Sequence, residues 1–240
     1  MTVDALFLGA HPDDVELCSG GLVAKLVAAG RRVGVVDLTR GEMGTRGTAE
    51  IRAEEAKQAR EKLGIASAEN LGLPDGRLEV TEEAKRLVIE AIRRASPRLL
   101  VAPHRVDLHP DHAAAGRLVD EVRYLCGMPK WPAAGEPCRV PLVLRTMFHT
   151  PFDPDVVVDI SDVFEEKLEA IRCYASQLHR PDVAEEGPGT NIGRKDFLLR
   201  WEARHRFWGE RIGAVFGEPY AVDGPIPVSN PDFLLDGLIS

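Results

Sequence analysis

The sequence predicts an α/β fold, in which helices cover both faces of a Rossmann-like, doubly wound and mostly parallel sheet, followed by a C-terminal extension. Three observations support this prediction. Short apolar runs alternate along the chain with longer amphipathic stretches. The apolar runs are continuous, as is typical of strands buried on both faces of a sheet. Glycine or a Pro-Asp-Gly turn stands where one element ends and the next begins.

The first half of the chain repeats the strand-to-helix alternation three times and ends on a fourth strand. Gly30 and Gly64 follow the first two helices as helix-stop residues, and Thr81 is suited to cap the third. The strand before Thr81 is weaker in apolar character than the others. The predicted strands are 5–8, 33–38, 70–73 and 98–102, and the predicted helices are 16–29, 50–63 and 81–95.

The second half is less regular. A helix over 111–125 is followed by the proline-rich stretch 128–141, which we expect to be an irregular excursion. Strands are predicted at 142–148 and 156–160, a helix capped by Ser161 that runs to residue 175, and a final helix at 191–212. We expect one domain over 1–240, in which 215–240 is a tail rich in proline and glycine.

Composition excludes several classes of protein. The chain has 240 residues, of which 44% are hydrophobic and 28% charged, as in ordinary globular proteins. A net charge of −8 gives no basic surface for nucleic acid, and no apolar run approaches the roughly 20 residues that span a membrane. The four cysteines form no Cys-x-x-Cys pair, so we expect neither a disulfide framework nor a zinc knuckle, and a reducing cytoplasm fits best.

Two His-Pro-Asp segments open helices directly after predicted strands. Residues 10–16 read Ala-His-Pro-Asp-Asp-Val-Glu after the first strand, and residues 109–112 read His-Pro-Asp-His after the fourth. In a doubly wound sheet these two strands are commonly neighbours, and the loops at their carboxyl ends meet where ligands bind. The sequence therefore predicts a cluster of imidazole and carboxylate groups at that edge.

The spacing within the two motifs favours a metal-dependent hydrolase. His11 and Asp14 are three residues apart, so a helical turn can aim both at one ion, with His112 arriving from the other loop. Two imidazoles and one carboxylate suit Zn²⁺, or alternatively Fe²⁺. Asp13 is then free to act as the general base, and His109 as a second proton carrier, which Asp111 could hold in one tautomer.

The two motifs and the strand-to-helix alternation have three other interpretations. His-Pro-Asp is also simply a good helix start, because proline suits the first turn and aspartate the positive end of the helix dipole. A non-haem iron oxygenase uses the same ligand set. A nucleotide-binding module is suggested by the alternation, but Ser19-Gly20-Gly21 does not complete a dinucleotide fingerprint. His104, His149, His179 and His205 lack partners at useful spacing and are expected to be structural.

The two motifs together closely resemble the PIG-L or LmbE-like family of metal-dependent N-acetylglucosamine deacetylases. The similarity continues through Leu38-Thr39-Arg40-Gly41-Glu42, Asn70-Leu71-Gly72, Val158-Asp159-Ile160-Ser161 and Tyr174-Ala175-Ser176-Gln177. It is strongest to the bacillithiol-pathway branch, the N-acetyl-α-D-glucosaminyl L-malate deacetylases.

The resemblance implies roles for particular residues. It makes His11, Asp14 and His112 the zinc ligands, Asp13 the general base, and His109, oriented by Asp111, the acid that stabilises the tetrahedral intermediate. Arg52 matches a family arginine that contacts substrate and would bind a carboxylate bidentately, although an exposed helix arginine is the alternative.

The expected reaction is zinc-dependent hydrolysis of the N-acetyl group of a small sugar conjugate, N-acetyl-α-D-glucosaminyl L-malate, releasing acetate. The alternative within the family is another N-acetylglucosamine conjugate. Relatives of this kind tend to form homo-oligomers, often hexamers, and the aromatic residues Trp201, Phe207 and Trp208 on the last helix could pack in the core or at such an interface.

Overall fold

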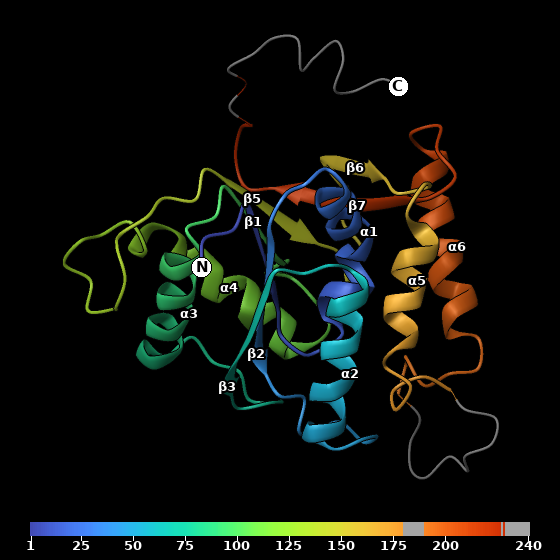
Figure 1. Ribbon diagram of the computed structural model, residues 1–240, viewed down its shortest axis with the longest axis horizontal. Coiled ribbons are helices and arrows are strands. Elements are labelled where there is room, and N and C mark those ends of the chain that lie inside the picture. The colour runs from blue at the N-terminus through green and yellow to red at the C-terminus, as the bar shows by residue number, and fades with distance from the viewer. Residues whose placement is uncertain (180–189, 227, 229–240) are drawn as a thin grey trace.

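The computed structural model describes residues 1–179, 190–226 and 228, and their backbone builds a mixed sheet flanked by helices (Figure 1). The strands are β1 (Ala5–Gly9), β2 (Val33–Thr39), β3 (Ser67–Leu73), β4 (Leu99–Pro103), β5 (Leu142–Thr146), β6 (Val156–Asp159) and β7 (Gly217–Val222). The helices are α1 (Asp14–Ala28), α2 (Ala49–Lys62), α3 (Glu82–Ala95), α4 (Pro110–Leu125), α5 (Phe164–Arg172) and α6 (Phe197–Glu210). Of the helices that the described residues form, none is both long and apolar enough to cross a membrane.

The strand order is β3-β2-β1-β4-β5-β7-β6, and the first five strands run parallel. This is the doubly wound α/β fold that the sequence predicts, and the prediction is confirmed. β1 pairs directly with β4, with Ala5 opposite Leu99 and Phe7 opposite Val101. The loops that follow these two strands therefore leave the sheet side by side, which brings the two His-Pro-Asp segments together.

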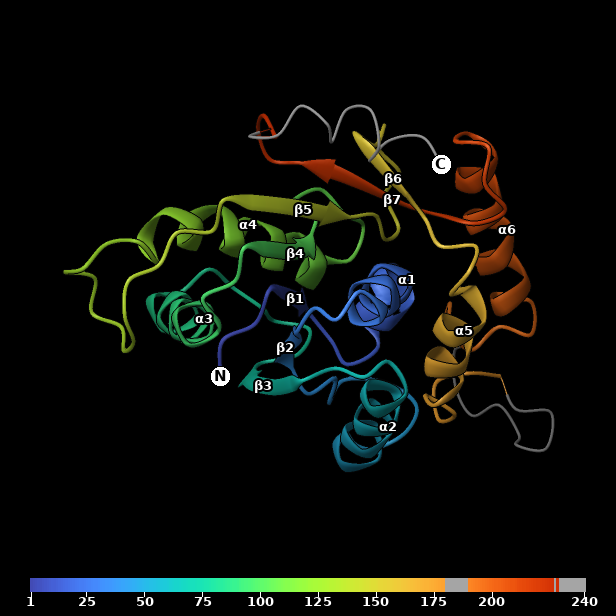
Figure 2. The same cartoon turned by 45° about the horizontal axis from the view of Figure 1, so that its top comes forward.

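Helices cover both faces of the sheet (Figure 2). Because side chains alternate along a strand, Leu6 and Leu8 of β1 face the apolar cluster that contains residues of α3 and α4, whereas Ala5 and Phe7 face the cluster with α1, α2 and α5. α6 lies outside α5 and packs against β7. The parallel strands β1, β2, β4 and β5 are buried and carry the continuous apolar runs from which they were predicted, whereas β3 at the edge of the sheet is largely exposed.

The C-terminal tail contains a strand that the sequence analysis missed. β7 lies between β5 and β6 and pairs antiparallel with both, for example Arg145 with Ala221 and Val158 with Glu218. It contains a proline and a buried glutamate, which made it look unlike a strand. Part of the segment 215–240, which was expected to be a tail, is therefore a strand of the sheet. Residue 227 and the residues from 229 onward lie outside the described part.

Two helix boundaries also differ from the prediction. Ser161 does not cap α5, which begins at Phe164, because its hydroxyl donates to Asp159 and accepts from the backbone N–H groups of Val215 and Phe216. The final helix begins at Phe197, since residues 191–196 form turns. The stretch 128–141 contains no helix or strand, as predicted.

A buried ion pair joins α5 and β7 to the middle of α1. Lys167 Nζ lies 2.6 Å from Glu218 Oε1 and 2.7 Å from the carbonyl oxygen of Leu17, and both charged side chains are fully buried. Glu218 also accepts hydrogen bonds of 2.8 Å from the backbone N–H groups of Gly21 and Leu22. A Cβ at Gly21 would stand 2.6 Å from Ile160, so this glycine permits the close approach. The glycine pair of α1 thus serves packing, not nucleotide binding.

Candidate active site

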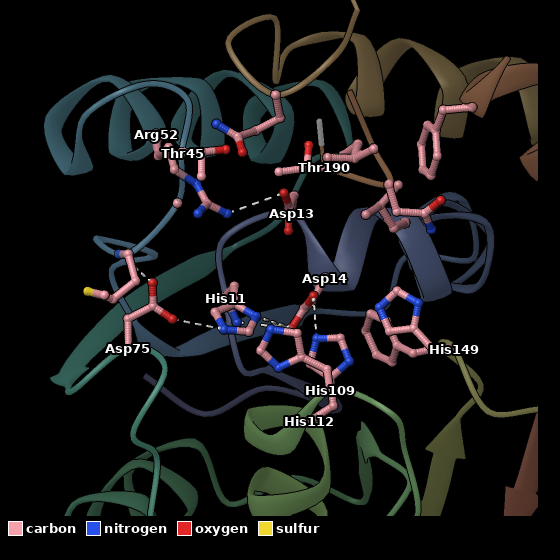
Figure 3. A pocket seen from close by; sticks show the side chains of 18 of the residues that line it. His11, Asp13, Asp14, Thr45, Arg52, Asp75, His109, His112, His149 and Thr190 are labelled. Atoms are coloured by element: carbon pink, nitrogen blue, oxygen red, sulfur yellow. Dashed lines mark hydrogen bonds and ion pairs between the residues drawn. The ribbon is translucent and has the colours of Figure 1, made fainter. Parts of the chain in front are cut away.

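The three predicted metal ligands meet at the carboxyl edge of β1 and β4 (Figure 3). One ligand atom from each of His11, Asp14 and His112 lies within 4.8 Å of the others, and all three residues are buried. The Asp14 carboxylate stands 3.5 Å from His11 Nδ1 and 3.3 Å from His112 Nε2. Two imidazole nitrogens and a carboxylate converging in this way form a donor set suited to a divalent cation.

The far nitrogen of each imidazole faces a second carboxylate. His11 Nε2 lies 3.0 Å from Asp75 and 3.2 Å from Asp111, and His112 Nδ1 lies 3.1 Å from Asp107. Such contacts fix the ring orientation and leave the nitrogen nearer Asp14 available as a ligand.

The same carboxylates make the cluster attractive to positive charge. Burial lowers the pKa of both histidines, but the contacts with Asp111, Asp14 and Asp75 raise the pKa of His11 well above its usual value. For His112 the charge of Asp14 and the hydrogen bond with Asp107 raise the pKa to about 9. A site that stabilises cationic imidazoles this strongly also has the charge balance that a divalent metal ion requires.

Asp13 lines the same cavity as the three ligands but is not part of the donor set, and its backbone is left-handed. It has φ 103° and ψ −24° at the start of α1, a conformation that costs a non-glycine residue about 1–3 kcal/mol. Its carboxylate lies 3.2 Å from Arg52 Nη2. Burial raises the pKa of Asp13 to about 7, with Asp14 adding to the rise, while Arg52 and His11 oppose it. A carboxylate with a pKa near neutrality is suited to accept a proton.

Arg52 is a buried residue of the site and not an exposed helix arginine. Only 5% of its surface is accessible, and it lines the same cavity as Asp13. Its guanidinium also donates to the carbonyl oxygens of Pro12, at 2.6 Å, and Gly41, at 3.0 Å. Several of its donors are therefore already used within the protein, and its direct structural effect is to hold Asp13.

His109 lies beside both histidines of the cluster, with its ring centroid 4.8 Å from that of His11 and 4.6 Å from that of His112. Its Nδ1 accepts a hydrogen bond of 3.2 Å from the backbone N–H of Asp111. In the neutral ring the proton then resides on Nε2. Burial and the neighbouring His112 and His11 lower the pKa of His109.

The carboxylate of Asp111 does not make the predicted contact with His109. It accepts hydrogen bonds from the backbone N–H groups of Gly76, at 2.7 Å, and Leu78, at 3.1 Å, and it contacts His11. An oxygen of this carboxylate lies within 4.8 Å of a His109 nitrogen, but the hydrogen bonds of the carboxylate go to other groups. Asp111 orients His109 only through its backbone, and its side chain orients His11.

Three residues of the site were missed by the sequence analysis. Asp107 holds His112 and accepts three backbone hydrogen bonds, Asp75 holds His11, and His149, expected to be structural, lines the cavity. His149 also offers a nitrogen within 4.8 Å of Asp107 and His112. Asp75 could have been found, because it follows β3 at the same sheet edge as the two motifs.

The cluster opens into a cavity of about 400 Å³ with two chemically different walls. The polar wall includes Asp13, Arg52, Thr45, Asp75 and Gln177 (Figure 3). The apolar wall is formed by Leu17, Phe148, Ile192, Phe197 and Trp201. The cavity therefore offers both polar and apolar contacts to a ligand bound beside the His and Asp cluster.

Comparisons with known proteins agree with this geometry. The family model PIG-L, described as GlcNAc-PI de-N-acetylase, matches residues 6–123, which include both motifs. A diacetylchitobiose deacetylase of Thermococcus kodakarensis is 33% identical over 72% of this chain and 69% of its own. A probable N-acetyl-alpha-D-glucosaminyl L-malate deacetylase 2 of Bacillus cereus is 32% identical over 82% of this chain and 93% of its own.

The fold is also shared with a solved structure, that of the conserved protein TT1542 from Thermus thermophilus. The two superpose with a TM-score of 0.85 at 36% identity, covering 96% of this chain and 98% of the other. With the family model and the relatives, this confirms the resemblance to the PIG-L or LmbE-like family. The protein is therefore an enzyme of the PIG-L family of de-N-acetylases.

Proposed function

We propose that the protein hydrolyses the N-acetyl group of a glucosamine conjugate, releasing acetate and a free amine, with Zn²⁺ as its metal. The proposal rests on the position of Asp13 beside the cluster of His11, Asp14 and His112. A buried carboxylate with a pKa of about 7 lines the same cavity as the His11, Asp14 and His112 donor set without being part of it. A hydrolase needs both a cation site and a separate proton acceptor.

His11, Asp14 and His112 would hold the metal, and their nitrogen and oxygen donors fit Zn²⁺, with Fe²⁺ or another divalent ion as the alternative. When bound, the ion supplies Lewis acidity, which polarises a carbonyl group and makes water more acidic.

The chain's own residues supply the proton transfers. Asp13 accepts a proton from the attacking water, and Arg52 keeps its carboxylate in place. The Nε2–H of His109 donates a hydrogen bond to the carbonyl oxygen as negative charge develops there. His109 then delivers its Nε2 proton to the amide nitrogen and takes up the proton that Asp13 received from water, so that the amine leaves and both side chains return to their starting forms. The separate pair of Asp13 and His109 favours hydrolysis over iron-dependent oxygenation, the other chemistry that this donor set permits.

We propose N-acetyl-α-D-glucosaminyl L-malate, an intermediate of bacillithiol biosynthesis, as the substrate. Support comes from the Bacillus cereus relative and from Arg52, whose guanidinium lines the cavity. The alternative is another N-acetylglucosamine conjugate, since the Thermococcus kodakarensis relative is named for diacetylchitobiose.

Acetate release from equal concentrations of three compounds separates these substrates. N-acetylglucosaminyl malate should give a higher kcat/KM than diacetylchitobiose or free N-acetylglucosamine. A preference for diacetylchitobiose would replace the malate assignment and retain deacetylation. No acetate from any of the three, with metal bound, would contradict the proposed reaction on these sugars.

A cytoplasmic location and a homo-oligomeric state, possibly the hexamer of similar proteins, complete the proposal. The four free cysteines suit a reducing compartment. On α6, Trp208 is buried, whereas Leu199 and Phe207 are more than half exposed and available for contact with another copy. A monomer in light scattering at micromolar concentration would contradict the oligomer.

A further inference from the structure

Cys126 and Cys138 lie in contact although twelve positions separate them along the chain. Cys126 follows the last residue of α4, and Cys138 comes near the end of the irregular stretch that leads to β5. The backbone N–H of Cys138 donates a hydrogen bond of 3.1 Å to the carbonyl oxygen of Cys126. The thiol of Cys126 donates to the carbonyl oxygen of Arg123, at 3.1 Å, and that of Cys138 to the carbonyl oxygen of Ile92, at 3.6 Å. A disulfide requires Cα atoms about 4.4 to 6.8 Å apart, and residues joined by a direct backbone hydrogen bond meet this condition.

Other contacts hold the stretch between the two cysteines in place. The buried guanidinium of Arg93 on α3 donates to the carbonyl oxygens of Cys126, at 3.2 Å, of Met128, at 2.7 Å, and of Ala133. One turn earlier on α3, Glu90 accepts a hydrogen bond of 3.2 Å from the backbone N–H of Ala134. The two cysteines are thus brought together by a loop that is anchored to a helix.

The two cysteines are not equivalent. Cys126 is fully buried, whereas Cys138 is partly exposed. The interaction with the neighbouring Cys126 thiol lowers the pKa of Cys138 to about 7, with the positive charge of Arg93 adding to the effect, and the same interaction raises the pKa of Cys126. The accessible sulfur is therefore also the one with more thiolate at neutral pH, which is the form that attacks a disulfide.

We propose that Cys126 and Cys138 form a thiol-disulfide exchange site that takes a low-molecular-weight disulfide as its oxidant. The Cys138 thiolate attacks one sulfur of that disulfide, whose S–S bond breaks and releases one small thiol. Cys126 then loses its proton and attacks the Cys138 sulfur of the mixed disulfide. The second small thiol leaves with the electron pair and a proton, and an intramolecular disulfide closes the loop. Two protein thiols are oxidised and one small disulfide is reduced to two thiols.

The test uses the full chain with oxidised glutathione. After incubation, free thiols are blocked with N-ethylmaleimide, and intact mass and peptide mapping are recorded without reductant. We expect the protein to lose two hydrogen atoms in mass, two of its four thiols to escape alkylation, and one peptide pair to join Cys126 with Cys138. Four alkylated thiols, or a cross-link that involves Cys18 or Cys173, would overturn the proposal.

Variants assign the order of the two steps. Cys126→Ser should stop at a stable mixed disulfide between glutathione and Cys138, whereas Cys138→Ser should take up no glutathione at Cys126. The matched control is Cys173→Ser, which replaces another partly exposed cysteine and should still form the internal disulfide. Glutathione attached to Cys126 in the Cys138→Ser variant would contradict the assigned nucleophile. If a serine variant does not fold, as judged by circular dichroism, the peptide map of the unaltered protein decides.

Discussion

His112 Nδ1 lies 3.1 Å from Oδ1 of Asp107, a carboxylate that also accepts hydrogen bonds from the backbone N–H groups of His109, His149 and Thr150. The contact turns Nε2 of His112 toward Asp14. Asp107, whose side chain is buried, thus joins the second motif to the loop after β5. It also fixes the orientation of the imidazole of His112, a candidate metal ligand.

Asp107→Asn should weaken metal binding about 10- to 100-fold, because the amide no longer offers a charged acceptor to His112. Competition with a chelator, followed by elemental analysis, measures the change. Asp153→Asn, at an exposed aspartate outside the cavity, is the matched control and should bind metal normally. Equal affinities in the two variants would show that Asp107 does not support the ligand.

Asp13→Asn should keep the metal and lose about 100- to 10,000-fold in kcat, because the amide cannot accept a proton from water. KM should change far less than kcat, since the amide has the shape of the carboxylate and its oxygen can still accept from Arg52. Steady-state acetate release, with metal content measured on the same sample, tests both points. Turnover close to that of the unaltered enzyme would remove Asp13 from the mechanism.

His112→Ala should lower metal content, because it removes one of the three converging donors. The comparison is His104→Ala, whose ring packs against Phe152 outside the cavity and which should retain the metal. Elemental analysis after dialysis gives the occupancy. Full occupancy in the His112 variant would contradict its role as a ligand.

Glu218→Gln should reduce the free energy of unfolding by about 3–5 kcal/mol, because it leaves the Lys167 ammonium buried without its counter-ion. Glu169→Gln breaks a pair in which both side chains are about half exposed and should cost less than about 1 kcal/mol. Urea unfolding followed by circular dichroism compares the two. Similar losses would mean that burial of the Lys167 pair has no special energetic consequence.

The parallel part of the fold could be predicted because its signals are local. Each of its strands except β3 is a short apolar run, and β3 ends at a Pro-Asp-Gly turn. β7 could not be found in this way, since Glu218 and Pro219 read as tail residues when taken alone. The buried charge of Glu218 is compensated by Lys167 and by backbone N–H groups of α1, and only folding brings these groups close to it.

The same distinction between local signals and contacts distant in sequence applies to the site. His11, Asp14 and His112 were predicted because their spacing within two short motifs already implies convergence. The contact between Asp111 and His11 joins residues 100 positions apart, so the sequence pointed to the nearer His109 instead. Which side chain orients a metal ligand depends on the distance between them in the folded protein, and that distance cannot be read from the sequence.

The ion pair between α5 and β7 also bears on how the nascent chain acquires its active site. Lys167 contacts the carbonyl oxygen of Leu17, one turn beyond Asp14, and remains without a counter-ion until residue 218 has been synthesised. Until then the backbone N–H groups of Gly21 and Leu22 in α1 also lack the hydrogen bonds that Glu218 accepts from them. We expect released chains truncated before residue 218 to be cleaved by protease within α1, and the full chain to resist. Both motifs are synthesised well before residue 218, so the helix that carries Asp14 would be completed long after its own synthesis.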